Sequence, residues 1–360
     1  MNKNLNSNYY EEGELFFGIN PPNSQSTKSN SEWARLDGSL VKIKNKKLSN
    51  KIGLGSWNTQ ISNFGISLIS AIAYGNGTWV AGGVALIRTS TDNGVTWVTR
   101  SGVNGNETFY SVLYANNIWT ATGWTGSQSV IRTSTNNGVT WNIQTTNAGN
   151  NIFADIAYGN GAWIVVGSSG VVRSSYDAIN WNTVVTGMPA VAIWGVAYGN
   201  NTWIIGGGSG YIRTSTDNGT TWTSQSSRTS DDINAISYSN GIWLLAGENG
   251  TMRSSTDAIN WNTVLSNTST TIESIAYGNG TWVAVGFNGT IRTSTDAINW
   301  NTEISNFGNT TNTIYNAAYG NSVWFIVGQN GQIKTKSNIL SSFYLNQIKI
   351  AHNIYGWLKL

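Results

Sequence analysis

The sequence of 360 residues predicts an all-β fold, a seven-bladed β-propeller of four-stranded blades. A unit of about 40 residues recurs seven times, and each copy contains four short segments of β-type composition. Gly occurs 41 times and Trp 18 times, whereas only 10% of the residues are charged. This Gly content disfavours helices, and the aromatic content excludes a disordered chain. Four strands in each of several such units are typical of a propeller, which closes on itself.

Two series of Trp residues mark the copies. The first Trp lies in phrases such as Ala-Tyr-Gly-Asn-Gly-Thr-Trp-Val, at Trp79, Trp119, Trp163, Trp203, Trp243, Trp282 and Trp324. The second closes phrases such as Arg-Thr-Ser-Thr-Asp-Asn-Gly-Val-Thr-Trp, at Trp57, Trp97, Trp141, Trp181, Trp222, Trp261 and Trp300. Neighbours within each series are 39 to 44 residues apart, so both series follow one repeat.

The first copy shows how the four strands of a blade are expected to follow one another. The expected strands are Ile69–Tyr74, Thr78–Gly82, Leu86–Ser90 and Trp97–Arg100. The Asn-Gly pair between the first two favours a tight hairpin. The segment Thr91–Thr96 is expected to form the turn before the fourth strand.

The last copy predicts how the ring closes. It supplies strands around Tyr315–Tyr319, Val323–Val327 and Gln332–Lys336, but no closing Trp strand follows. Residues 56–62 include Trp57-Asn-Thr-Gln-Ile-Ser, which matches the fourth-strand phrase Trp300-Asn-Thr-Glu-Ile-Ser. We therefore expect an N-terminal strand to complete the last blade. The predicted domains are an N-terminal arm or attachment segment (1–55), the propeller (56–337) and a C-terminal tail (338–360), with both tails leaving from one blade.

Composition excludes several classes of site. There is no Cys, and His352 is the single His, so we expect no disulfide, metal site or cofactor. The net charge is +3, but residues 56–337 carry −2 and the basic excess lies in the tails, which argues against nucleic-acid binding. The N-terminus lacks the apolar core of a signal peptide, and no stretch is long and apolar enough to cross a membrane. We therefore expect neither export by a cleaved signal nor membrane insertion.

A resemblance to a known family enters with the turn phrases. Ser90-Thr-Asp92-Asn-Gly94-Val-Thr-Trp97 resembles the Asp box, Ser-x-Asp-x-Gly-x-x-Trp, of BNR-type and sialidase-like propellers. The phrase that ends at Trp222 fits equally well, whereas one copy has Asn in place of Asp and three are one residue shorter and lack the Gly. The Asp-box positions, expected to be structural, are Asp92, Asn136, Asp177, Asp217, Asp257 and Asp296. The chain is also similar to photosystem II assembly-factor propellers and to propeller repeats of bacteriophage tail and fibre proteins.

The repeated charged residues are interpreted as scaffold. An Asp-box carboxylate can accept backbone N–H bonds within its turn, and the Trp can pack on a neighbouring blade. One third-strand position holds a basic residue in every copy: Arg88, Arg132, Arg173, Arg213, Arg253, Arg292 and Lys334. These are expected to brace adjacent structure, with a basic ring that receives an acidic partner as the alternative. The sialidase reaction that the resemblance implies needs three Arg, and outside the repeat the body has only Arg100 and Arg228. We expect no enzyme.

Positions at which the copies differ are the candidates for a binding site. One lies at the start of the first strand: Ser70, Tyr110, Ala154, Trp194, Asn234, Glu273 and Tyr315. The other follows the second strand: Val84, Trp124, Ser168, Gly208, Glu248, Phe287 and Gln329. Propeller topology places both on one face, near the central channel. The expected ligand-binding residues are Trp124, Trp194, Tyr110, Tyr315, Phe287, Glu248, Glu273 and Asp155, which suit a sugar or a peptide. The alternative is variation without function, with Trp194 plugging the channel.

These features favour a non-enzymatic propeller of a phage virion, located in a tail, fibre or baseplate. Residues 1–55 and 338–360 would hold other virion proteins or form a homo-oligomer, and the variable face would contact a host-surface glycan or protein. No nucleic acid is expected as a partner. The alternatives are a cytoplasmic assembly factor that docks subunits of membrane-protein complexes, and a soluble lectin.

Overall fold

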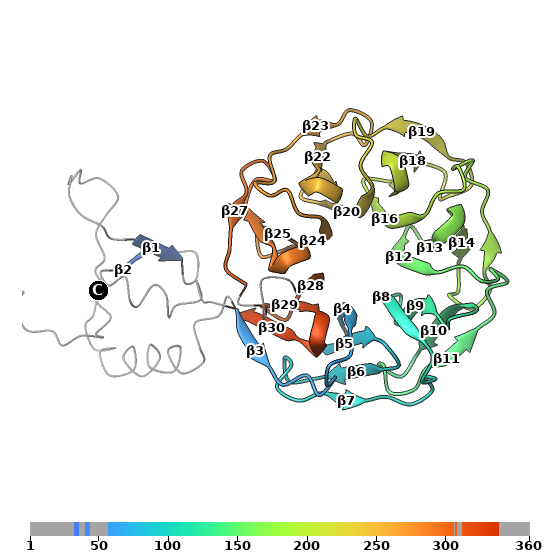
Figure 1. The fold of residues 1–360 in the computed structure, drawn as a ribbon, viewed down its shortest axis with the longest axis horizontal. Coiled ribbons are helices and arrows are strands. Elements are labelled where there is room, and N and C mark those ends of the chain that lie inside the picture. Colours follow the sequence, from blue (N-terminus) through green and yellow to red (C-terminus); the bar gives the residue numbers. More distant parts are fainter. Residues whose placement is uncertain (1–31, 36–39, 44–56, 306, 308–311, 338–360) are drawn as a thin grey trace, which may run out of the picture. The chain divides into compact units, whose positions relative to one another are not determined.

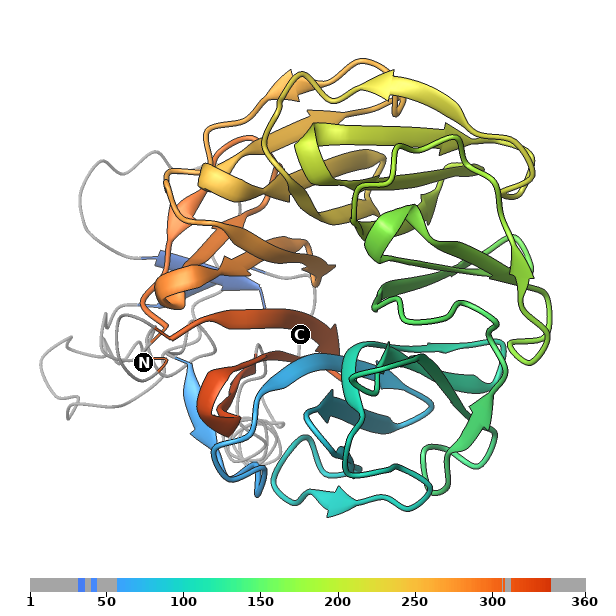
Figure 2. The same ribbon diagram turned by 45° about the vertical axis from the view of Figure 1, so that its right-hand side comes forward.

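The chain folds as a closed ring of seven four-stranded sheets (Figure 1). The computed structural model describes residues 32–35, 40–43, 57–305, 307 and 312–337. The ring belongs to one compact unit, Trp57–Thr335. In the part of the chain that is described, its only helices are single 3₁₀ turns. The predicted all-β, seven-bladed fold is confirmed, and Figure 2 shows the blades around the central opening from a second direction.

In blades 1 to 6 the strands follow one another from the centre to the rim of the ring in chain order, whereas the outermost strand of blade 7 precedes blade 1 in the chain (Figure 1). The innermost first strands of blades 1 to 7 are β4 (Ile69–Gly75), β8 (Thr108–Ala115), β12 (Phe153–Gly159), β16 (Ile193–Gly199), β20 (Ile233–Ser239), β24 (Ile272–Gly278) and β28 (Ile314–Gly320). The second strands are β5 (Thr78–Gly83), β9 (Ile118–Trp124), β13 (Ala162–Gly167), β17 (Thr202–Gly207), β21 (Ile242–Gly247), β25 (Thr281–Gly286) and β29 (Val323–Gly328).

The third and fourth strands complete the outer half of each blade. The third strands are β6 (Ile87–Ser90), β10 (Ser129–Ser134), β14 (Val172–Ser175), β18 (Tyr211–Ser215), β22 (Met252–Ser255), β26 (Ile291–Ser294) and β30 (Ile333–Ser337). The fourth strands are β7 (Val98–Thr99), β11 (Asn142–Gln144), β15 (Asn182–Thr183), β19 (Thr223–Ser226), β23 (Asn262–Thr263), β27 (Asn301–Thr302) and, in blade 7, β3 (Asn58–Gln60). The 3₁₀ turns η1 (Ser168–Gly170), η2 (Gly208–Gly210), η3 (Glu248–Gly250), η4 (Phe287–Gly289) and η5 (Gln329–Gly331) join second to third strands in blades 3 to 7.

A second unit comprises Met1–Ser56 and Lys336–Leu360. The described part of its N-terminal segment is an antiparallel pair of strands, β1 (Glu32–Arg35) and β2 (Leu40–Ile43). The rest of the predicted segments 1–55 and 338–360 lies outside the described residues, so the attachment role given to them stays a prediction. No helix among the residues described has the length and apolar character needed to cross a membrane.

The ring closes through an N-terminal strand, as the sequence predicts. Strand β3 pairs antiparallel with β30, so that Asn58 lies opposite Thr335 and Gln60 opposite Ile333. Side chains support this pairing, because the Gln60 amide donates to Thr335 Oγ1 at 2.6 Å. Trp57 is buried in one cluster with Ile314 and other residues of blades 6 and 7. The chain therefore joins and leaves the ring at one blade.

The hydrophobic core lies between blades. Each of the seven clusters of buried residues combines side chains from two neighbouring blades. The cluster that joins blade 7 to blade 1 contains Phe325 and Ile333 together with Trp79 and Ile69. The first-series Trp residues are almost completely buried in these clusters. Since burial of such large side chains is the main favourable term in folding, the blades stabilise one another rather than themselves.

The recurring Tyr-Gly pair explains how neighbouring first strands come close. A Cβ atom at Gly159 would lie only 2.1 Å from the ring of Tyr198 in the next blade. The same relation joins Gly199 to Tyr238, and Gly320 to Tyr74 across the closure of the ring. Within each blade the Tyr ring also contacts the first-series Trp, with ring centroids 4.4 to 5.1 Å apart. The repeated phrase therefore encodes one contact between blades and one within each blade.

The Asp-box carboxylates are occupied inside their own turns. Asp177 Oδ1 accepts the backbone N–H groups of Ile179 and Asn180, at 2.9 and 2.8 Å. Asp257 and Asp296 repeat this arrangement in blades 5 and 6. The bonds to the backbone N–H and side-chain amide of Asn180 hold the pKa of Asp177 well below its usual value.

The third-strand arginines are engaged as well. Arg173 Nε donates to the Thr146 carbonyl at 3.1 Å, and Arg292 Nη2 donates to the Asn267 carbonyl at 2.8 Å. Each of these carbonyls belongs to the connection that precedes the blade of the Arg. In blade 2 a carboxylate takes the carbonyl's place, because Arg132 pairs with the buried Glu107. In these blades the series braces connections between blades.

If β3 is an integral strand of blade 7, Trp57 supports the ring as the other fourth-strand Trp residues do. Trp57 is 4% exposed, and Trp300 at the same repeat position is 3% exposed. We expect Trp57→Ala and Trp300→Ala each to lower the free energy of unfolding by about 3–5 kcal/mol, because both leave a large cavity. Urea unfolding followed by circular dichroism measures the change. Unaltered stability in Trp57→Ala, with a loss in Trp300→Ala, would show that the N-terminal strand does not hold the ring.

Candidate functional site

Every first strand contains a β-bulge near its beginning. In each blade the register with the second strand skips one residue, for example between Ile272 and Ser274 in blade 6. The skipped residues are Ser70, Tyr110, Ala154, Trp194, Asn234, Glu273 and Tyr315. They are the variable first-strand positions of the sequence. A bulged residue is unpaired and its side chain is redirected, so one residue in each blade is released from the sheet pattern.

A glycine at the end of the second strand, or one residue before it in blade 2, accompanies the bulge. A Cβ atom at Gly247 would lie 1.8 Å from the Asp232 carbonyl oxygen, so only Gly allows the two backbones this approach. The next residue, Glu248, donates its N–H to the same carbonyl at 3.0 Å. Phe287 forms the equivalent bond to Thr271 in blade 6. The device places the variable residue of the second-to-third loop beside the bulge of its own blade.

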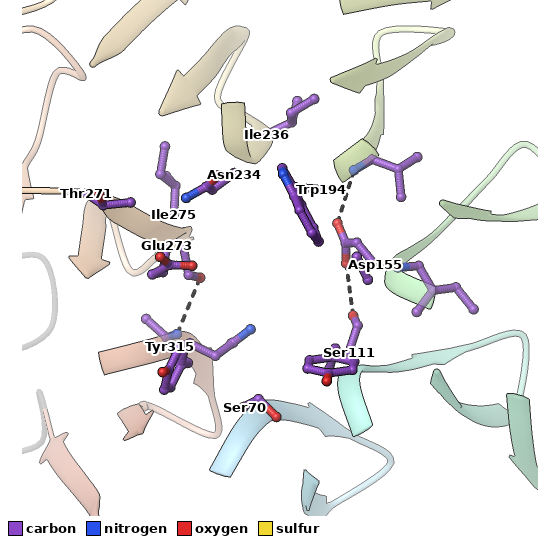
Figure 3. A pocket seen from close by; sticks show the side chains of 18 of the residues that line it. Ser70, Ser111, Asp155, Trp194, Asn234, Ile236, Thr271, Glu273, Ile275 and Tyr315 are labelled. Carbon is purple, nitrogen blue, oxygen red and sulfur yellow. Dashed lines mark hydrogen bonds between the residues drawn. The ribbon is translucent and has the colours of Figure 1, made fainter. Parts of the chain in front are cut away.

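The seven bulges surround one cavity of about 730 Å³ at the centre of the ring (Figure 3). All seven skipped residues line it. The residue two positions after each bulged residue also lines the cavity, and these residues form a second, apolar layer: Ile72, Val112, Ile156, Val196, Ile236, Ile275 and Ala317. The cavity therefore combines an apolar layer with a varied layer.

Seven of the eight predicted ligand-binding residues line this cavity: Tyr110, Asp155, Trp194, Glu248, Glu273, Phe287 and Tyr315. Trp124 is not among the lining residues, so its predicted role in ligand binding stays a prediction. In blades 3 to 7 a 3₁₀ turn begins at this position, whereas in blade 2 strand β9 continues through it and pairs Trp124 with Ser129. The indole N–H of Trp124 then donates to Asn150 Oδ1 at 2.9 Å, which fixes the ring elsewhere.

Some lining residues were not among the predicted site residues. Asp232 precedes the first strand of blade 5, and its Oδ1 accepts the Ser209 N–H at 2.7 Å. Ser111 and Asn316 each follow a bulged residue. A sequence pattern could have found them only if the bulge had been recognised, since a regular strand would turn these side chains to the other face.

Asp155 connects three blades. Its Oδ1 accepts the Ser111 hydroxyl of blade 2 at 2.9 Å and the N–H of Ile156 in its own blade at 2.8 Å. Its Oδ2 accepts the Val196 N–H of blade 4 at 3.1 Å (Figure 3). Burial raises the pKa of Asp155 to about 6, although these bonds act to lower it. This carboxylate is thus a structural clamp that also faces the cavity.

Glu273 lies across the cavity from Trp194, beside Tyr315 (Figure 3). Burial raises its pKa to about 7, and the negative charge of Glu248 raises it further. Among the described residues nothing hydrogen-bonds its carboxylate. It differs in this from Asp155, and it is free to meet a ligand.

The lining has one sign of charge. It contains Asp155, Asp232, Glu248 and Glu273, whereas no Lys, Arg or His is among the residues that line the cavity. Four aromatic side chains share the space: Tyr110, Trp194, Phe287 and Tyr315. This arrangement can stack against a ligand and accept hydrogen bonds from it. No group of three or more His, Cys, Asp or Glu placed to hold a metal ion occurs in the part of the chain described.

Ring and cavity together define the class of this protein: a β-propeller of seven blades with a ligand-sized opening at its centre. Comparison of the sequence with protein-family models and with curated proteins finds no match. Among solved structures the chain is similar to YCF48 from Cyanidioschyzon merolae, with a TM-score of 0.62 and 18% identity over 79% of this chain and 99% of that one. YCF48 bound to D1 peptide gives a TM-score of 0.62 at 18% identity, over 79% of this chain and 97% of that one.

The WD40 β-propeller domain of Doa1 matches with a TM-score of 0.63 and 12% identity, over 79% of this chain and 100% of that one. At such identities the likeness establishes the fold alone. The Asp-box family and the phage resemblance stay predictions from the motifs.

The raised pKa of Glu273 predicts that stability depends on pH. Its ordinary value is 4.5 and its folded value is about 7, so the folded protein holds this proton more tightly than the unfolded chain. The stability that the folded protein gains from binding this proton on Glu273 is complete below pH 4.5 and is lost as the pH rises to about 7. Relative to the native protein at each pH, we therefore expect Glu273→Gln to raise Tm at about pH 8 and to change it little at about pH 4.

Thermal melts of both proteins between these two pH values measure the difference. The matched control is Glu303→Gln, which removes a carboxylate outside the cavity. An equal gain in the control, or a gain in Glu273→Gln that does not vary with pH, would contradict this account of Glu273.

Proposed function

We propose that this protein is a non-enzymatic docking propeller that binds a segment of another polypeptide in its central cavity. One observation carries the proposal: the residues that differ between near-identical blades are the bulged residues that line one cavity. The scaffold repeats while its seven inward positions do not, as expected when a single asymmetric ligand is recognised. The sialidase reaction needs three Arg, and the lining residues include none.

The size and lining of the cavity support a peptide as the ligand. Its volume of about 730 Å³ lies within the roughly 300–1,000 Å³ of ordinary ligand sites. Aromatic and aliphatic walls suit side chains, and the carboxylates can accept backbone or side-chain donors. The structure of YCF48 with D1 peptide is an example of a peptide complex of this fold. A lectin with one sugar site in each blade would repeat its binding residues, whereas these differ from blade to blade.

Trp194 is the residue on which peptide binding should depend most. It projects into the cavity (Figure 3), and a buried interface Trp is worth about 2 kcal/mol or more. On an array of random 12-residue peptides we expect the native protein to bind a subset, and Trp194→Ala to bind those peptides at least about tenfold more weakly. The matched control is Trp124→Ala. Trp124 lies outside the cavity, so this variant should bind the same peptides as tightly as the native protein.

Two results would contradict the docking proposal. One is that the folded native protein binds no peptide on the array. The other is that Trp194→Ala binds as well as the native protein or better, as expected if this Trp only plugs the channel.

A virion role is the second candidate, and it is favoured by the way the chain meets the ring. Asn58 and Thr335 lie side by side in blade 7, so both flanking segments start from one blade, as suits a domain held at one point. In this role the partners of residues 1–55 and 338–360 are other virion proteins, and the bound polypeptide belongs to a host surface. In the rival role the propeller docks subunits of a cellular membrane-protein complex.

Density-gradient fractionation of the native source, with mass spectrometry of each fraction, separates the two roles. Recovery of the protein with phage-like particles is the outcome expected of a virion component. Recovery with cell membranes, or free in the lysate, would contradict the virion role and favour the cellular docking platform.

A further inference from the structure

The cavity has two chemically different walls. On the side of blades 2 to 4, Asp155 is the acidic group, and three donors satisfy its carboxylate. On the side of blades 5 to 7, Glu248 and Glu273 lie with Phe287 and Tyr315. No hydrogen bond from a described residue reaches either of these two Glu carboxylates. The asymmetry suggests that the second wall is completed by something outside the ring.

Backbone geometry fixes the second wall in place. Of the seven variable loop positions, Glu248 and Phe287 are those that line the cavity. Each begins a 3₁₀ turn and is held by its N–H bond to the carbonyl before the first strand, at 3.0 Å in both cases. Glu273 and Tyr315 are bulged residues of blades 6 and 7. All four positions are therefore set by the sheet edges, and a ligand meets a preformed surface.

Electrostatics define what this wall can accept. Glu248 and Glu273 are close enough for one charge to disfavour the other, and the lining supplies no cation. A carboxylate removed from water is stabilised by a paired cation or by donors. The aromatic rings of Phe287 and Tyr315 line the same cavity, and aromatic rings attract cations through cation–π contacts. A cationic group that reaches this wall would relieve the repulsion between Glu248 and Glu273.

We propose that the wall formed by Glu248, Glu273, Phe287 and Tyr315 is a subsite for a Lys or Arg side chain of the bound polypeptide. This inference rests on the proposed function, because the polypeptide carries the cation into the cavity. The subsite gives the docking reaction its register: the basic side chain enters between blades 5 and 7, while Trp194 packs on the neighbouring part of the segment.

The composition of the bound peptides tests the subsite directly. From the random peptide array we expect the peptides bound by the native protein to be enriched in Lys or Arg at one position. A bound peptide is then synthesised with that residue and with Gln in its place, and both dissociation constants are measured by fluorescence polarisation. For the native protein we expect the Gln peptide to bind at least about tenfold more weakly.

Glu273→Gln completes a double-mutant cycle, in which the two peptides should bind with nearly equal affinity. The control Glu303→Gln changes the net charge by the same amount outside the cavity, and its Gln oxygen can still accept the Trp57 indole N–H. It should preserve the full difference between the peptides. Melting curves of all variants verify that they are folded.

The outcomes separate the two proposals. Bound peptides without enrichment in Lys or Arg, or a difference that persists in Glu273→Gln, would overturn the cationic subsite and leave the docking function standing. A folded native protein that binds no peptide at all would overturn both. A loss of the difference in the Glu303→Gln control would show a general charge effect and would also overturn the subsite.

Discussion

The fold depends on a contact that recurs at five of the seven junctions between blades, a Tyr ring laid on the Gly backbone of the preceding blade. Ala115 and Ser239 hold the Gly position at the other two junctions. At Gly159 and Gly320 the Tyr carbons occupy the space that a side chain would need, so the first strands approach more closely than larger residues allow. Close first strands bring the second-strand Trp residues into the clusters between blades. Because every cluster is shared by two blades, no blade has a core of its own, and Trp57 beside β3 belongs to the cluster shared by blades 6 and 7.

The same geometry separates the scaffold from the site. Sheet pairing constrains nearly every position of a first strand, yet the bulge frees one residue in each blade from that constraint. The second-strand Gly is required for this device, because its missing Cβ admits the carbonyl of the opposing strand. Substitution at a bulged position therefore costs little packing. The seven bulged side chains, which vary in size from that of Ala154 to that of Trp194, line one cavity, while the scaffold of the ring stays the same.

Most of the fold and most of the cavity lining could be predicted from the sequence, for reasons that can be named. Repetition revealed the blades, and the match between the Trp57 and Trp300 phrases revealed the closure of the ring. Comparison of copies found the lining positions because only unconstrained residues vary. Trp124 lies outside this lining, because blade 2 extends its strand through a position at which blades 3 to 7 begin a 3₁₀ turn. The bulge itself could not be predicted from the sequence. It is a register shift between two paired strands, and it produces no periodic pattern in the sequence of either strand. Ser111 and Asn316, which follow bulged residues, were missed for that reason.

Asp155 and Glu273 show how a structure can indicate its partner. Burial raises the pKa of both carboxylates, so both are costly to keep charged in the folded ring. Donors from three blades offset that cost at Asp155, and this residue holds the inner strands together. At Glu273 nothing in the described chain offsets it, and Glu248 adds to it. A carboxylate whose cost is met inside the fold is explained by the fold. One whose cost is unmet, fixed by a bulge on the wall of an open cavity, is explained by a cation that arrives from outside.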